Sequence, residues 1–137
     1  MKAALIDTDI LSLYFKGHDQ VIARFSSYLE SHQRINFSII SYYEILSGLK
    51  HRDANKQLEL FIQFAAQSNI LPVSTESVSI SAEKYAQLRK QGTPVDDIDL
   101  LIAGIAIAND LVMVTNNNKH FCKINGLEIS NWSISGD

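Results

Sequence analysis

Two hydrophobic patterns alternate along the chain. Short apolar or alternating segments, typical of strands, occupy residues 3–6, 35–39, 70–73 and 111–114. Between them, apolar residues recur every three or four positions, as on one face of a helix, in residues 21–29, 42–49, 58–65 and 78–88. Strands that alternate with helices are joined by right-handed crossovers. The pattern therefore predicts an α/β fold with a mainly parallel central sheet and helices on both faces.

One further predicted helix is apolar nearly all round. It opens at Thr93-Pro94 and runs to Ile107, and such a helix is buried on most of its sides. The helix over residues 42–49 is expected to end at Gly48 or at the charged residues 50–53. Trp132 is expected to anchor the last strand.

The chain has 137 residues, of which 46% are hydrophobic and 20% charged, so it can fill a core, and we expect a single domain over residues 1–137. A net charge of −3 argues against binding to nucleic acid or to an anionic membrane through bulk positive charge. A nucleic-acid enzyme stays possible, because a metal ion can supply local positive charge.

The cysteine content and the N-terminus indicate a reducing compartment. Cys122 is the single cysteine, which excludes an intramolecular disulfide and a cysteine-based zinc site. Residues 1–7 do not have the form of a secretory signal, and the longest apolar stretch, residues 100–108, is about half of a membrane span. We therefore expect a cytoplasmic protein.

Three acidic residues fall where this topology brings them together. Asp7 ends the first strand, Glu44 is expected in the first turn of the helix after the second strand, and Asp99 lies near the start of the buried helix. Ligands of such sheets bind beyond the carboxyl ends of the strands. Carboxylates gathered there repel one another, and a bound Mg²⁺ or Mn²⁺ relieves the repulsion. Because such an ion activates water and stabilises charge on a phosphate, phosphodiester hydrolysis is the chemistry that the pattern favours.

Each acid also has a structural interpretation. Ser41 and Glu44 match the S-x-x-E capping box, in which Glu44 only satisfies a backbone N–H of its own helix. Asp96 and Asp97 fit a helix cap or the surface, and Asp9 is expected to cap a helix or face solvent. Asp99 is harder to explain in this way, because its neighbours are apolar and a partly buried carboxylate needs a partner.

Four segments, in order, resemble the motifs of PIN-domain ribonucleases, and the last resembles the closing region of VapC-type toxins: residues 5–11, 38–48, 92–103 and 111–132. The resemblance implies a three-layer α/β/α fold, RNA cleavage that depends on Mg²⁺ or Mn²⁺, and a role as the toxin of a toxin–antitoxin pair. It places Asp7, Glu44 and Asp99 in the acidic metal site, with Asp7 and Asp99 as direct ligands. Asn117 stands where the family often has a fourth acid, and we expect one well-held metal ion in the free protein.

The resemblance also implies partners. These are an RNA substrate, an antitoxin whose C-terminal segment occludes the acidic groove, and a second copy in a homodimer built on helical faces. Scattered basic residues either steer RNA phosphates or belong to the solvated surface: Lys16, Lys50, Arg52, Lys119 and Lys123. His120 is either a general acid or a surface histidine, and Thr8 and Thr115 are either polar contacts of the site or turn residues.

Two other functions compete with this interpretation. The segment from Asp7 to Asp9 fits the D-x-D start of a haloacid-dehalogenase-like phosphatase, although Leu11 stands where that family has Thr or Val. In addition, the acid pair Asp96-Asp97 precedes Thr115 where it should follow. The second alternative is a non-catalytic RNA-binding module with a PIN fold, against which the three retained carboxylates argue.

Overall fold

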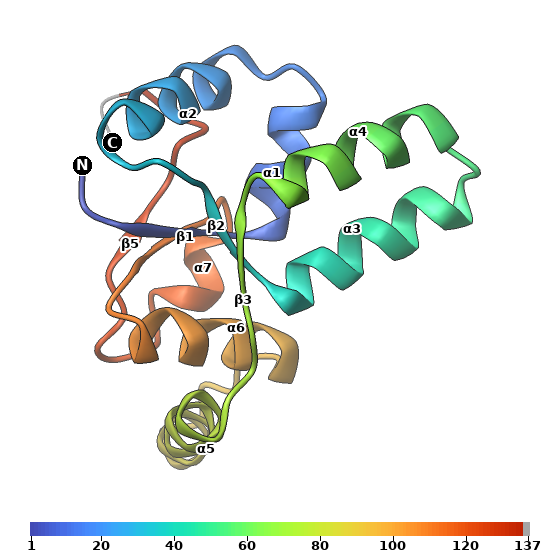
Figure 1. Cartoon of the computed structure of the whole chain (residues 1–137). Coiled ribbons are helices and arrows are strands. Elements are labelled where there is room, and N and C mark those ends of the chain that lie inside the picture. The colour runs from blue at the N-terminus through green and yellow to red at the C-terminus, as the bar shows by residue number, and fades with distance from the viewer. Residues whose placement is uncertain (136–137) are drawn as a thin grey trace.

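A computed structural model describes residues 1–135. Its centre is a sheet of five short parallel strands in the order β3-β2-β1-β4-β5 (Figure 1). The strands are β1 (Ala4–Ile6), β2 (Asn36–Ser38), β3 (Asn69–Leu71), β4 (Val112–Val114) and β5 (Ile129–Ser130). The predicted α/β class and the parallel sheet are confirmed.

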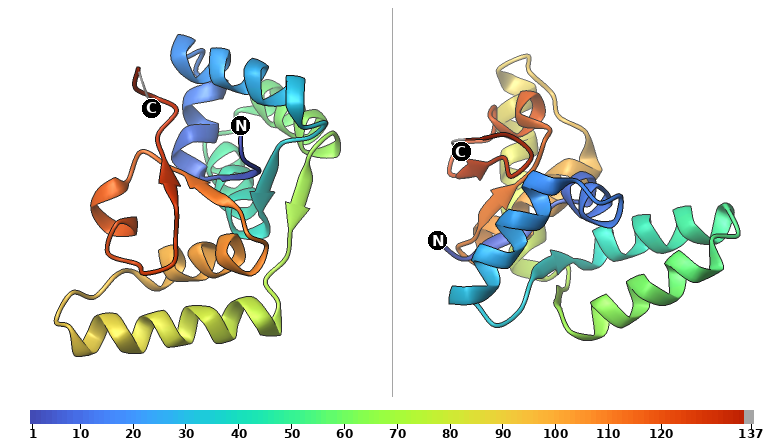
Figure 2. Two further views of the ribbon diagram at one scale, coloured as in Figure 1. Left: turned by 90° about the vertical axis from the view of Figure 1, so that its left-hand side faces the viewer. Right: turned by 90° about the horizontal axis from the view of Figure 1, so that it is seen from above.

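Helices cover both faces of the sheet, in the three layers that the resemblance implied. They are α1 (Thr8–Phe15), α2 (Asp19–Ser31), α3 (Ile39–His51), α4 (Asn55–Ala66), α5 (Thr75–Lys90), α6 (Asp97–Ala108) and the short α7 (Asn118–Phe121). Helices α5 and α6 lie together below the sheet in Figure 1, with α1 and α2 above it. Helices α3 and α4 form a hairpin that extends away from the body, which Figure 2 shows from two further sides.

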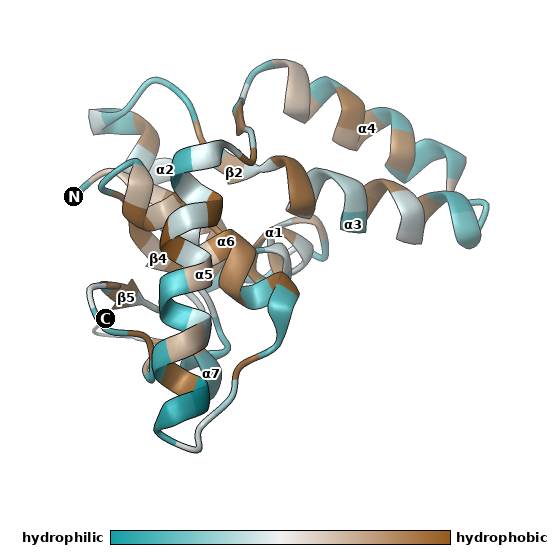
Figure 3. Cartoon of the chain, turned by 90° about the horizontal axis from the view of Figure 1, so that it is seen from below, coloured by the Kyte–Doolittle hydropathy of each residue, from teal (hydrophilic) through white to brown (hydrophobic). Residues whose placement is uncertain are grey.

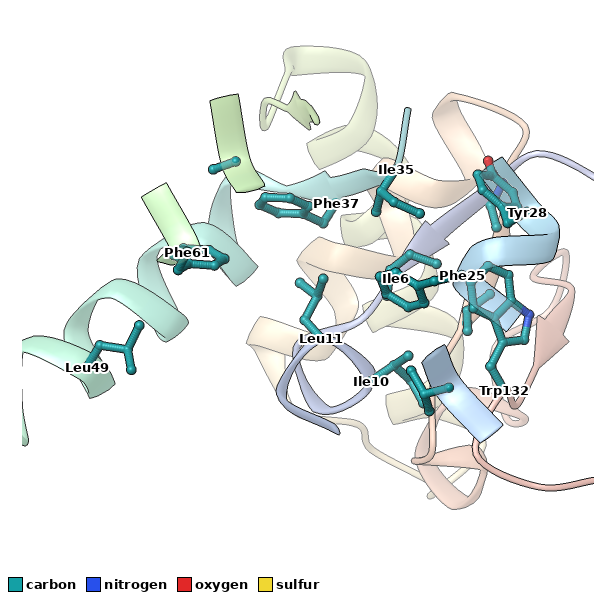
Figure 4. Packing of buried hydrophobic residues seen from close by; sticks show 14 residues of the cluster. Ile6, Ile10, Leu11, Phe25, Tyr28, Ile35, Phe37, Leu49, Phe61 and Trp132 are labelled. Atoms are coloured by element: carbon teal, nitrogen blue, oxygen red, sulfur yellow. The ribbon is translucent and has the colours of Figure 1, made fainter. Parts of the chain in front are cut away.

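The alternation of side chains along the strands divides the core into two clusters. On β1, Ala4 and Ile6 face one cluster with side chains of α1 to α4, whereas Leu5 faces the other with α6. Figure 4 shows the first cluster, in which Phe37 of β2 lies near Phe61 of α4 and Phe25 lies near Trp132. Trp132 is buried in this cluster, just after β5, in agreement with its expected role as an anchor.

The buried helix begins later than predicted. Residues 93–96 are not helical, and α6 starts at Asp97 with Asp96 as its cap, whose carboxylate accepts a hydrogen bond from the N–H of Ile98. The pattern misplaced this start because Pro94 and Val95 continue the apolar character of the helix without being part of it. Figure 3 shows α6 as largely hydrophobic behind a hydrophilic first turn.

One helix was missed by the prediction, and one of the two predicted ends of another helix is confirmed. No element was predicted for residues 8–15, which form α1, capped by Asp7 and buried at Ile10 and Leu11. Helix α3 runs through Gly48 to His51, so the charged residues end this helix and the glycine does not. No helix among residues 1–135 is long and apolar enough to cross a membrane.

Candidate active site

Asp7 is fixed at the carboxyl end of β1, in the middle of the sheet. Its side chain is only 7% exposed. Its Oδ1 accepts a hydrogen bond from the N–H of Thr8 (2.8 Å), and its Oδ2 accepts one from the hydroxyl of Thr115 (2.8 Å). Thr115 follows β4, the strand paired with β1. Neighbouring strand ends therefore hold this carboxylate in one orientation.

Glu44 reaches the same edge through a chain of hydroxyl groups. Its carboxylate accepts a hydrogen bond from the hydroxyl of Thr8 (2.6 Å), and the same hydroxyl lies 2.8 Å from that of Ser41. The N-cap of α3 is Ser38, whose side chain accepts from the N–H of Ser41, so the predicted Ser41–Glu44 capping box is wrong. Because α3 starts at Ile39, Glu44 lies in its second turn and not in the first. Its carboxylate is thus available to the site.

Asp99, on α6, contacts the segment of the chain that follows β4. Its Oδ2 lies 3.4 Å from Nδ1 of His120, and the same Nδ1 lies 3.1 Å from the amide nitrogen Nδ2 of Asn117. The Asp99 side chain is 21% exposed and that of His120 is 50% exposed. The backbone N–H of Asn117 donates to the hydroxyl of Thr115. Asn117 and Asp99, both predicted site residues, therefore lie together at this edge.

Asp9 is a further acid of the site, which corrects its expected capping or solvent-facing role. Its Oδ2 accepts from the backbone N–H of Asn116 (3.1 Å), whereas its buried Oδ1 has no hydrogen-bond partner within residues 1–135. The side chain of Asn116 is itself held by Asn131 and Ser133, which follow β5. The C-terminal segment thus supports the loop that contacts Asp9.

Burial and mutual repulsion both disfavour the ionised forms of these acids. Burial raises the pKa of Asp7 to about 7, with a further increase from the charges of Asp9 and Asp99, and only the hydrogen bonds of Thr115 and Thr8 act in the other direction. Burial also raises the pKa of Asp9 and that of Asp99, although the contact with His120 lowers the latter. A cation bound among these oxygens would stabilise the ionised carboxylates and so lower their pKa values.

The oxygen ligands present suit a hard divalent cation. Within residues 1–135 no three His, Cys, Asp or Glu side chains already stand close enough to enclose a metal ion. Mg²⁺, however, is normally held by one or two carboxylates and keeps several water molecules. Asp7 and Asp99 supply two carboxylates whose charges already interact, and the buried Oδ1 of Asp9 lacks a partner. The residues therefore fit a site for one ion that is largely completed by water.

A groove of about 350 Å³ begins at the site and follows the α3–α4 hairpin. Its lining includes Thr8 and Glu44 of the site, with Lys16 and Arg52 as basic residues. The remainder is largely apolar, with Phe15, Ile45, Leu49, Leu60 and Phe61. The acidic edge is thus continuous with a surface that can hold an elongated chain.

The predictions missed contacts that three residues make at this edge of the sheet. Asp9 was expected to cap a helix or to face solvent, and its contact with the N–H of Asn116 shows otherwise. His120 lies three positions after Asn117, on the first turn of α7, a spacing that places both on one side of the turn. That spacing was the available signal. No pattern in the sequence indicates that Asn131 holds the side chain of Asn116.

Comparison with known proteins identifies the family. The PIN domain family matches residues 4–127. The chain is 28% identical over 130 residues to Ribonuclease VapC1 of Haemophilus influenzae, covering 94% of this chain and 97% of that protein. It is 32% identical over 100 residues to the tRNA(fMet)-specific endonuclease VapC of Salmonella typhimurium, covering 72% and 76%.

Solved structures agree with this result. The DNA-bound VapBC complex of Salmonella typhimurium contains a chain that superposes with a TM-score of 0.85 at 28% identity, covering 96% of this chain and 99% of that one. The chain belongs to the PIN-domain family, among the VapC ribonucleases.

Proposed function

We propose that this protein is a metal-dependent endoribonuclease that acts as the toxin of a toxin–antitoxin pair. VapC nucleases of the PIN family generally depend on a divalent metal. The observation that carries the proposal is the buried Asp7, which two hydrogen bonds hold in place while burial and the charges of Asp9 and Asp99 raise its pKa to about 7. A carboxylate that the fold desolvates in this way gains most from a cation.

The proposed roles follow from the positions of the side chains. Asp7 and Asp99 would hold Mg²⁺ or Mn²⁺. When bound, the ion lowers the pKa of a water molecule and stabilises charge on the phosphate. Glu44, oriented by Thr8, adds a further carboxylate that can accept a proton or orient water at this edge. Asn117 contributes an uncharged polar group where the family often has an acid.

The groove along the α3–α4 hairpin supports the proposal of an antitoxin partner. Related toxins have been solved as complexes with their antitoxins, such as VapBC of Salmonella typhimurium. A segment with an apolar face would bury the apolar lining of the groove, and its acidic residues would meet Lys16 and Arg52. Because Thr8 and Glu44 line the same groove, an occupied groove blocks access of RNA to the site. This is our assignment of the antitoxin face.

Several further proposals follow from the same activity. Single-stranded or looped RNA suits an open acidic edge better than a regular duplex. The working compartment of such an enzyme is the cytoplasm, where its RNA is found. We also propose that residues 1–137 form one PIN-like domain and that two copies associate through helical faces.

Asp99→Asn tests the proposal, with Asp97→Asn as the matched control, since Asp97 lies exposed in the same first turn of α6. Purified wild-type protein and both variants are incubated with total RNA and with initiator tRNA, in Mg²⁺, in Mn²⁺ and in EDTA. We expect cleavage only with metal, a loss of about 10³-fold in Asp99→Asn, and little change in Asp97→Asn. Growth arrest on expression without a partner should follow the same order.

The proposal fails if the wild-type protein cleaves none of these RNAs with metal, or if cleavage is equal in EDTA. Equal activity of Asp99→Asn and Asp97→Asn would remove Asp99 from the site. Sequencing the RNA ends from the active samples identifies the cleaved position.

A further inference from the structure

The side chain of Asn131 joins the end of β5 to the segment that follows β4. Asn131 is only 5% exposed, and its amide nitrogen Nδ2 donates a hydrogen bond to Oδ1 of Asn116 (2.8 Å). Its Oδ1 accepts from the backbone N–H of Ser133 (2.9 Å) and from the Ser133 hydroxyl (2.6 Å). Because a backbone N–H can only donate, Oδ1 must face Ser133 and Nδ2 must face Asn116. The orientation of this buried amide is therefore fixed.

Asn116 carries this contact into the candidate active site. It belongs to residues 115–117, which form neither helix nor strand, so side-chain hydrogen bonds help to determine the path of this segment. While its side chain accepts from Asn131, its backbone N–H donates to Oδ2 of Asp9 (3.1 Å). Oδ1 of Asp9 is buried and has no hydrogen-bond partner within residues 1–135. The orientation of this carboxylate therefore depends on its contact with Asn116.

The same segment also holds the central acid of the site. Thr115, next to Asn116, is fully buried and donates its hydroxyl to Oδ2 of Asp7. A shift of Asn116 would move Thr115 as well, because the two residues are covalently joined. Asn131 cannot shift readily, because Trp132, the next residue, is buried in the core. A fixed amide thus restrains a segment whose own groups contact two acids.

We propose that Asn131 is a positioning residue for RNA cleavage. Through Asn116 it holds the segment after β4 in the orientation that the acids of the site require. The inference rests on the proposed function, because it assumes that RNA is cleaved at this edge of the sheet. The role is indirect, since the amide of Asn131 is buried and reaches Asp9 only through Asn116. Outer partners that orient the side chains of a metal site typically contribute about 10- to 100-fold to activity.

Asn131→Ala and Asn116→Ala test this role, with Asn109→Ala as the matched control. The side chain of Asn109 donates a hydrogen bond to the carbonyl oxygen of Ile105, at the end of α6 opposite to Asp99. We expect kcat for RNA cleavage in Mg²⁺ to fall about tenfold in both test variants. KM should stay within about twofold of wild type, because the acids are displaced and the surfaces that hold RNA are not. The control should keep both constants.

A double variant shows whether the two residues act together. If Asn131 acts through Asn116, the protein with both substitutions should lose no more kcat than either single variant. If the two losses multiply, the residues act independently, and the proposed route through Asn116 is wrong.

Amide hydrogen exchange, followed by ¹H–¹⁵N NMR of the full-length protein in EDTA, measures the positioning without relying on activity. The N–H of Asn116 is hydrogen-bonded to Asp9 in the wild type. We expect its exchange to become about fivefold faster in Asn131→Ala and to stay unchanged in Asn109→Ala. Thermal unfolding checks that each variant folds.

The outcomes separate this inference from the proposed function. Asn131→Ala with the kcat of wild type, or with unchanged exchange at Asn116, overturns the inference and leaves the proposed function standing. If Asn131→Ala does not fold, a folded Asn116→Ala with the kcat of wild type has the same consequence. A wild-type protein that cleaves no RNA in the presence of metal overturns both. Equal losses of kcat in the single and double variants, together with faster exchange at Asn116, support the inference.

Discussion

Asp7 and Glu44 are both residues of the candidate active site, but the fold holds them in opposite ways. Asp7 is 7% exposed, lies between neighbouring strand ends and has a hydrogen-bond donor on each oxygen. Glu44 is exposed on α3 and is held by a single hydroxyl, that of Thr8. The fold holds Asp7 in one orientation at the cost of removing its carboxylate from water. Glu44 stays hydrated, and its side chain is free to change rotamer.

The two carboxylates therefore suit different tasks: Asp7 has a fixed position, whereas Glu44 can adapt its position to a ligand. A buried carboxylate at the centre of the sheet is fixed before any ligand arrives, which is how a metal site is preorganised. An exposed carboxylate on the α3–α4 hairpin can move with an RNA chain or an antitoxin segment that enters the adjoining groove. Substitutions at the two positions should therefore affect stability, pH dependence and activity in different proportions.

The largest effect on stability is expected from Asp7→Asn, and it depends on pH. The pKa of Asp7 rises from 3.8 to about 7 on folding, so between these values the folded protein binds more protons than the unfolded chain. Stability from this group is therefore complete at low pH and is lost as the pH rises toward 7. Asn carries no charge and lacks this loss. Between about pH 4.5 and about pH 8 in EDTA, the stability of Asp7→Asn relative to wild type should rise by about 3 kcal/mol.

Urea unfolding at several pH values measures this difference, with Asp53→Asn, an exposed site, as the control. Because Asn has one acceptor oxygen where Asp has two, a constant loss is expected at all pH values and cancels in the comparison. Parallel stability curves for Asp7→Asn and wild type would show that the burial of Asp7 does not oppose its charge.

A smaller effect is expected from Thr115→Val. Thr115 is fully buried, and its hydroxyl donates to Asp7 and accepts from the N–H of Asn117. Val keeps the shape of the strand end and removes both hydrogen bonds, which should cost about 1.5 kcal/mol of stability. Since the lost bond lowers the pKa of Asp7, that pKa rises further and Mn²⁺ binding at neutral pH weakens.

Thr115→Ser, which keeps the hydroxyl, should retain wild-type metal affinity. Calorimetric titration with Mn²⁺ and thermal unfolding measure the two effects. If Val and Ser behave alike, the hydroxyl does not hold Asp7.

The same contrast explains which features could be predicted from the sequence. The strands, the parallel sheet and the position of Asp7 follow from hydrophobic patterns that burial enforces over several residues. The start of α6 at Asp97 and the cap at Ser38 depend on single hydrogen bonds, and neighbouring polar residues offered equally good candidates. The contacts of Asp9 with Asn116 and of His120 with Asp99 join distant segments, so no local pattern contains them.

The smallest effect on stability is expected from Glu44→Gln, which probes the adaptable side of the site. Gln keeps an oxygen that can accept from the hydroxyl of Thr8, and the position is exposed, so stability should stay within about 0.5 kcal/mol of wild type. A negative charge at the proposed metal site is lost, and RNA cleavage should fall by about tenfold, equivalent to about 1.4 kcal/mol in the barrier. Glu59→Gln, on the exposed surface of α4, is the matched control. Rates from RNA cleavage under single-turnover conditions, read beside thermal unfolding, separate the two quantities. A Glu44→Gln variant with full activity would make Glu44 a surface residue of the groove, whereas one that is destabilised as strongly as Thr115→Val would make it a structural partner of Thr8.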